Sequence, residues 1–142
     1  MGGAAVLRAV AKKGVTPNAL ILESPFDSLL TTVSNRFHAL GLPAFPSAGL
    51  LVFWGSVQHG FNGFEHNPAD YAQAVRCPVL LLHGESDPRV TTKQARDIYT
   101  RLGVYKEFVE FPAAGHESLI RADPAIWKEH VGRFLDGITV SH

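Results

Sequence analysis

The chain has 142 residues, a length that suits one domain, and its 46% hydrophobic and 18% charged content argues against disorder. Thirteen basic residues balance thirteen acidic ones, so the charge does not favour nucleic acid as a partner. The single cysteine excludes an internal disulfide framework and a cysteine-rich zinc site.

The first half of the chain is predicted to contain two helices and one strand. Residues 2–13 are rich in Ala, Leu and Lys and stop at Gly14, which is typical of a helix with a glycine terminus. Residues 18–24 are a short apolar run between prolines, and we predict a strand there. Residues 29–40 are predicted to be helical. Residues 43–64 are rich in glycine and aromatic residues, and we predict irregular structure for them.

The second half alternates helices and strands. We predict helices over residues 68–75, 91–102 and 124–135. Two strands, over residues 78–83 and 107–111, are predicted between them. Residues 78–83 (PVLLLH) are an uninterrupted apolar run ending at a histidine, as expected for a strand buried on both faces. Thr91 or Thr92 is the expected N-cap of one helix, and Asp123 of another.

This alternation predicts a three-stranded parallel sheet flanked by helices, in which chemistry sits at the carboxyl ends of the strands. Asp87 follows the second strand, and His116 follows the third. The loops after adjacent parallel strands are neighbours in space, so Asp87 is placed to accept a hydrogen bond from His116. A histidine held by a carboxylate in this way suits general-base work at neutral pH.

Several segments resemble α/β-hydrolases. HGESDPRV resembles the segment that carries the catalytic acid in these enzymes, and FPAAGH resembles the strand and turn that carry the catalytic histidine. MGGAAVLRAVA resembles the start of the helix that follows the nucleophile, and ESPFDSLLTTV resembles the next strand and loop of aminopeptidase-like, prolyl-oligopeptidase-like and lysophospholipase-like serine hydrolases. The resemblance implies that the whole chain, residues 1–142, is the C-terminal portion of one α/β-hydrolase domain.

The resemblance also implies roles for individual residues. Asp87 takes the position of the triad acid, His116 that of the general base, and Met1 that of the residue whose backbone N–H stabilises the oxyanion. The nucleophilic serine is expected immediately before Met1, outside this sequence. Ser24 and Ser86 are the serines nearest by loop position, but neither lies in a G-x-S-x-G turn, so we do not expect either to replace it.

The region 43–66 either forms a partial lid over an acyl pocket or packs on the sheet. On the first interpretation Phe26, Phe53, Trp54 and Phe61 line the substrate pocket. An apolar substrate, such as an acyl ester or a hydrophobic amide, suits such side chains better than a sugar or a phosphate does.

Other reactive residue types are interpreted as structural. His83 ends a buried strand and is expected to be a packed residue near the site, and Cys77 a small packed residue. His59 and His66 lack further ligands at metal-site spacing. The sequence therefore implies neither a metal ion nor an organic cofactor.

Three functions remain open. The chain is part of a serine hydrolase acting on an ester or amide, a non-catalytic binding module, or a half-enzyme completed in trans by another chain. In the strand order that the resemblance implies, residues 19–23 would pair with the strand that leads to the nucleophile, and this sequence lacks that strand. The unpaired apolar edge predicts that the chain either self-associates or is marginally stable. No apolar run approaches the roughly 20 residues of a spanning helix, and no signal peptide is recognisable, so the cytoplasm is the expected compartment.

Overall fold

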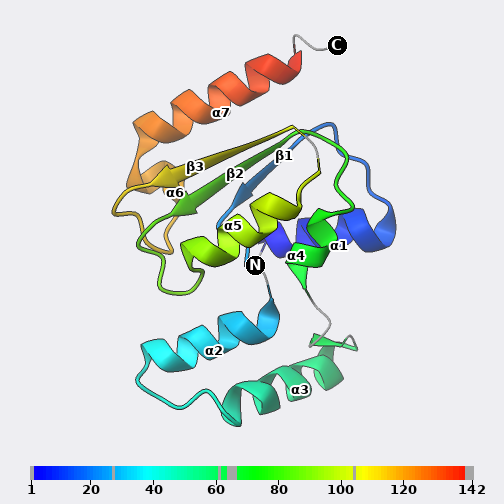
Figure 1. Cartoon of the computed structure of the whole chain (residues 1–142), viewed down its shortest axis with the longest axis vertical. Coiled ribbons are helices and arrows are strands. Elements are labelled where there is room, and N and C mark those ends of the chain that lie inside the picture. Colours follow the sequence, from blue (N-terminus) through cyan, green and yellow to red (C-terminus); the bar gives the residue numbers. More distant parts are fainter. Residues whose placement is uncertain (1, 27, 61, 64–66, 104, 140–142) are drawn as a thin grey trace.

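The computed structural model describes residues 2–26, 28–60, 62–63, 67–103 and 105–139. Its centre is a parallel sheet of three strands in the order β1 (Leu20–Glu23), β2 (Val79–Gly84) and β3 (Lys106–Phe111), shown in Figure 1. Leu22 lies opposite Leu81, and Leu81 lies opposite Phe108. All three predicted strands and their parallel arrangement are confirmed.

Helices cover both faces of the sheet (Figure 1). On one face lie α1 (Gly2–Lys13), α4 (Pro68–Ala72) and α5 (Thr92–Arg101); on the other lie α6 (Leu119–Ala122) and α7 (Pro124–Thr139). Alternate residues of β2 point to opposite faces, so Leu81 packs with Leu7 and Ile98, whereas Leu82 packs with Phe134. Every residue of β2 is buried, which explains its uninterrupted apolar run.

The predicted helix caps are also present. Thr91 accepts a hydrogen bond from the backbone N–H of Gln94 at the start of α5, and the Gln94 side chain closes a capping box. Asp123 Oδ1 accepts from the backbone N–H groups of Ala125 and Ile126, each at 3.0 Å, at the start of α7. Gly14 follows α1 with a φ of +66°.

Two helices were not predicted. The prediction of irregular structure over 43–64 was wrong for Ser47–His59, which form helix α3; Gly60, at a φ of +65°, ends it. Tertiary packing overrides the weak helix propensity of the glycines in α3, because its Ala48 and Val52 are buried. The four-residue helix α6 is too short to leave a periodic pattern in the sequence.

Helices α2 (Leu29–Ala39) and α3 form a layer of their own, beyond the helices that cover the sheet (Figure 1). The Asn35 side-chain amide donates to Gln94 Oε1 at 2.9 Å, which ties α2 to α5. Across the described residues, β1 has a strand partner on one side only, as predicted. No helix in the described part of the chain has the length and apolar character needed to cross a membrane.

Candidate active site

The loops after β2 and β3 lie against each other at the carboxyl end of the sheet. The backbone N–H of Ser86 donates to Ala114 O at 2.9 Å, and that of Glu85 donates to Phe111 O at 3.1 Å. These bonds continue the pairing of β2 with β3 beyond the last residue of each strand. They bring the loop that carries Asp87 next to the loop that carries His116.

Asp87 is held by hydrogen bonds to both of its carboxylate oxygens. Oδ1 accepts from the backbone N–H groups of Arg89 at 2.8 Å and Val90 at 3.0 Å. Oδ2 lies 2.7 Å from His116 Nδ1. The Asp87 side chain is fully buried, so the bonds that it accepts replace the water that its oxygens would otherwise bind.

His116 is positioned for proton transfer. An ionised Asp87 Oδ2 can only accept, so a neutral His116 paired with it carries its proton on Nδ1 and has a lone pair on Nε2. The side chain is 34% exposed. Its outer nitrogen can therefore meet a reacting group while its inner nitrogen stays bound to Asp87, and this is the arrangement of a general base with its orienting acid.

Gly84 allows the two loops to approach each other, a role that was not predicted from the sequence. A Cβ atom on this residue would lie 2.5 Å from Ala114 O and 2.7 Å from Gly115 O, closer than real Cβ atoms come to backbone oxygen. The signal in the sequence was a glycine at the end of a buried strand, which often marks a close approach of another backbone segment.

His83 is buried beside the site, as predicted, but its polar atoms are unusual. The side chain is fully inaccessible, and neither Nδ1 nor Nε2 has a hydrogen-bond partner among the described residues. Burial lowers the pKa of His83 below the ordinary value of 6.5, with smaller opposing effects from carboxylates including Asp87 and Glu110. His83 is therefore neutral in the folded protein at neutral pH.

This burial predicts a pH-dependent stability. The unfolded chain binds a proton at His83 more readily than the folded chain, so the stability present above pH 6.5 is lost as the pH falls towards the lower pKa of the folded protein. The loss is at most about 1.4 kcal/mol per pH unit for one proton. Urea unfolding of wild type and His83→Leu between pH 7.5 and 5 should give a shallower pH slope for the variant. The exposed His38→Ala is the control, and equal slopes for His83→Leu and wild type would contradict the prediction.

The serines considered as substitutes are not joined to His116. In the described part of the chain, Asp87 is the only hydrogen-bond partner of the His116 ring. Ser24 follows β1 with a φ of +40°, and its backbone N–H donates to Leu82 O. Ser86 is exposed in the same loop as Asp87. Neither serine is held against the base.

The residues predicted to line a pocket occupy two environments. Phe26 is buried with Ala4 and Val90, and Val90 belongs to the loop of the acid. Phe53 and Trp54 are 50% and 61% exposed on α3 and share no buried cluster with Phe26. Their role in lining a substrate pocket stays a prediction.

Three of the predictions concern parts of the chain that the structure does not describe. Met1 and Phe61 lie outside the described residues, as do residues 64–66 at the end of the expected lid. In the ranges that are described, no three His, Cys, Asp or Glu side chains are grouped so as to hold a metal ion.

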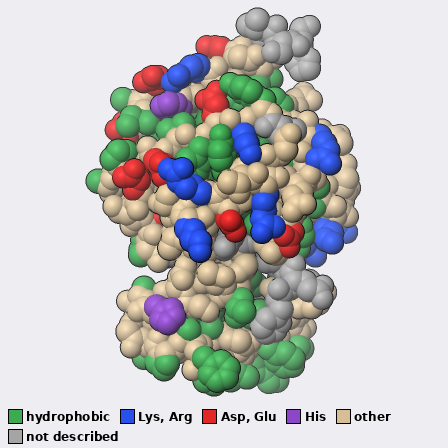
Figure 2. Space-filling view, in the orientation of Figure 1, with side chains coloured by type: hydrophobic (Ala, Val, Ile, Leu, Met, Phe, Trp, Pro, Cys, Tyr) green, Lys and Arg blue, Asp and Glu red, His purple; other side chains and the backbone are tan. Residues whose placement is uncertain are grey.

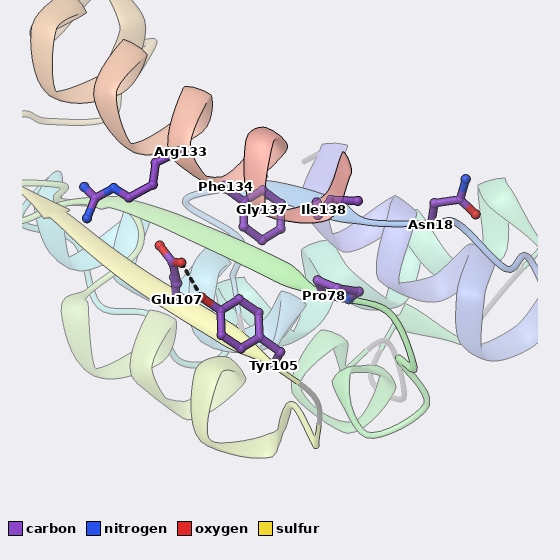
Figure 3. Close-up of a pocket in the computed structure, with 8 residues that line it drawn as sticks. All are labelled: Asn18, Pro78, Tyr105, Glu107, Arg133, Phe134, Gly137 and Ile138. Carbon is purple, nitrogen blue, oxygen red and sulfur yellow. Dashed lines mark hydrogen bonds between the residues drawn. The ribbon is translucent and has the colours of Figure 1, made fainter. Parts of the chain in front are cut away.

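A separate cavity of about 380 Å³ lies between β3 and α7 (Figure 3). Phe134, Ile138 and Pro78 contribute apolar surface to it, and the Tyr105 hydroxyl donates to Glu107 Oε1 at 2.7 Å on its other side. The Glu107 carboxylate raises the pKa of Tyr105 through this bond and its charge. Tyr105 and Pro78 precede β3 and β2, so the cavity lies at the opposite end of the sheet from Asp87 and His116.

A family model matches nearly the whole chain, and curated proteins match parts of it. The model of the prolyl oligopeptidase family matches residues 1–140. Lysophosphatidylserine lipase ABHD12 of Macaca fascicularis is 26% identical over 106 residues, which are 75% of this chain and 26% of that lipase. The uncharacterized peptidase YuxL of Bacillus subtilis (strain 168) is 36% identical over 56 residues, 37% of this chain and 8% of that protein.

Solved structures have the same fold. The esterase Pf2001 of Pyrococcus furiosus superposes with a TM-score of 0.64 at 22% identity, over 94% of this chain and 50% of the esterase. The acylaminoacyl peptidase of Pyrococcus horikoshii gives a TM-score of 0.64 at 23% identity, over 97% of this chain and 22% of the peptidase. The predicted α/β-hydrolase fold is confirmed. The chain spans about a quarter of the lipase and half of the esterase.

Proposed function

The chain belongs to the prolyl oligopeptidase family of α/β-hydrolases, and from this premise we propose that it carries the acid and the base of a serine hydrolase site. Asp87 is the acid and His116 is the base. The observation that supports these roles is the 2.7 Å contact between His116 Nδ1 and the buried Asp87 carboxylate, on the loops that follow neighbouring strands. We further propose that the nucleophilic serine comes from outside these 142 residues.

The proposed reaction is acyl transfer to water. His116 Nε2 takes the proton of the serine hydroxyl as its oxygen attacks the acyl carbonyl carbon, and the imidazolium then gives the proton to the leaving alcohol or amine. Water, activated by the same nitrogen, hydrolyses the acyl-enzyme. The Asp87 carboxylate stabilises the imidazolium in both halves of the reaction, and the backbone N–H of Met1 is the proposed oxyanion donor.

The proposed substrate is an apolar acyl ester or amide. Phe26 follows β1 and Val90 follows the acid, and the two buried side chains pack together, so the loops of the proposed site rest on apolar residues. The similar proteins are a lysophosphatidylserine lipase, an esterase and an acylaminoacyl peptidase. Each of these names refers to a substrate with an acyl group. These names support an acyl substrate without separating an ester from a peptide.

A fluorophosphonate probe tests the assignment. The 142-residue chain should remain unlabelled, because no described serine is bound to His116. A protein extended by the preceding in-frame coding sequence, with a Gly-x-Ser before Met1, should be labelled at that serine. His116→Ala should reduce labelling of the extended protein by at least about 10³-fold. The exposed His38→Ala should label at the wild-type rate.

Two results would contradict the proposal. Stoichiometric labelling of the 142-residue chain at Ser24 or Ser86 would show that the nucleophile lies within it. Labelling of the extended protein that does not depend on His116 would remove that residue from the role of base. A stop codon directly before Met1 would instead direct the experiment to a partner chain that supplies the serine in trans.

A further inference from the structure

Helix α3 presents an apolar stripe to solvent. Leu50, Phe53, Trp54 and Val57 follow the spacing i, i+3, i+4 and i+7, which places them on one face of the helix, and each is 50–61% exposed. The opposite face carries Ala48, which is buried. The apolar stripe, as we call these four residues, therefore faces away from the rest of the molecule. Figure 2 shows hydrophobic side chains gathered at the α3 end of the molecule.

The segment that contains the apolar stripe has no acidic residue, lysine or arginine. Residues 37–64 form a run of 28 residues without a Lys, Arg, Asp or Glu. Leu51 and, in the connection between α2 and α3, Leu40, Leu42 and Phe45 are also at least half exposed. Large apolar side chains exposed in this number within one segment are rare on monomeric soluble proteins and indicate a surface that another molecule covers.

We propose that the apolar stripe, together with these four apolar neighbours, is the interface through which two copies of this chain associate. A large apolar side chain has an accessible surface of about 150–250 Å² when it is fully exposed. Multiplied by their exposed fractions, the four residues of the stripe and their four apolar neighbours expose on the order of 900 Å². A stable interface of standard size buries about 800 Å² on each partner. The available area is thus sufficient for a dimer.

The charge distribution favours a second copy over other occupants. Two surfaces without formal charge meet without repulsion and desolvate no ion, and the chain as a whole has a net charge of zero. Helices that lie on lipid surfaces usually carry Lys or Arg on their polar face, and α3 has neither residue. The enrichment in Trp and Phe is typical of the centre of a protein interface.

The test uses Trp54 as a reporter. The chain has two tryptophans, so Trp127→Phe leaves Trp54 as the only one, at the cost of one exposed hydrogen bond to Glu23. In lipid-free buffer, raising the protein concentration should double the mass measured by light scattering and shift the Trp54 emission to the blue. Leu50→Glu and, separately, Val57→Glu should each raise the dimer dissociation constant at least about tenfold.

Val15→Glu is the matched control, because Val15 is equally exposed but lies after α1, outside the apolar stripe; it should dimerise like the parent. A monomeric mass at every concentration would overturn the proposal. So would a dimer that both glutamate variants leave unchanged, which would place the contact elsewhere, such as the free edge of β1. A monomer whose Trp54 emission shifts only when phosphatidylcholine vesicles are added would assign the surface to lipid. None of these readouts depends on hydrolase activity.

Discussion

Gly84→Ala should destabilise the chain by about 1–3 kcal/mol or more and separate Asp87 from His116. The new Cβ would lie 2.5 Å and 2.7 Å from the carbonyl oxygens of Ala114 and Gly115. Both are backbone atoms, so no side-chain rotation can relieve the overlap, and the loop that carries His116 must move. Urea unfolding measures the loss of stability, and the proton resonance of His116 Nδ1–H reports whether its hydrogen bond to Asp87 persists.

Gly132→Ala is the matched control for this substitution. Gly132 lies inside α7, and a Cβ there would meet nothing within 4 Å. Alanine in a helix interior is favoured over glycine, so this variant should gain about 0.5–1 kcal/mol. A Gly84→Ala protein with wild-type stability and an unchanged His116 resonance would contradict the prediction, because the loops would then accommodate the methyl group without separating Asp87 from His116.

Asp87→Asn should reverse the tautomer of His116 while changing the stability by only about 1 kcal/mol. The asparagine oxygen can still accept from the backbone N–H groups of Arg89 and Val90, but its amide donates where the carboxylate oxygen accepted from His116 Nδ1. Nδ1 must then be the acceptor, and Nε2 carries the proton. In the proposed serine-bearing enzyme, a base with its outer nitrogen already protonated should lose about 10⁴-fold in rate.

Nitrogen-15 NMR of the imidazole distinguishes the two tautomers in the 142-residue chain itself. Asp87→Ala should behave differently, because it leaves two backbone donors without an acceptor and should cost roughly 2–3 kcal/mol. Asp97→Asn, an exposed residue of α5, is the control for removing one charge. The interpretation of Asp87 as the orienting group is contradicted if Asp87→Asn keeps its proton on Nδ1.

The strands and the pairing of Asp87 with His116 were predictable because they depend on local patterns. A continuous apolar run in β2 marks a strand buried on both faces, and parallel topology alone brings the loops after β2 and β3 together. The caps Thr91 and Asp123 were predictable for the same reason, since each lies directly before its helix.

The features that the sequence did not predict depend on tertiary contacts. Helix α3 forms from a segment whose glycines and prolines are typical of a loop, because Ala48 and Val52 find a surface on which to pack. The constraint on Gly84 arises from carbonyl groups 30 residues away in the chain. Likewise, the burial of His83 could be foreseen, but not that both of its ring nitrogens would lack a partner.

The hydrogen bond between Asn35 and Gln94 stabilises the position of α2 beside α5 by a small amount. Gln94 Oε1 also accepts from the Thr91 backbone N–H, so this one oxygen is shared by α2 and the segment that follows Asp87. One such bond contributes about 1 kcal/mol, which by itself favours the observed contact of α2 with α5 about fivefold over its absence. A preference of that size is small, so the position of α2 also depends on the packing of Leu29, its first residue, against Phe26 and Val90.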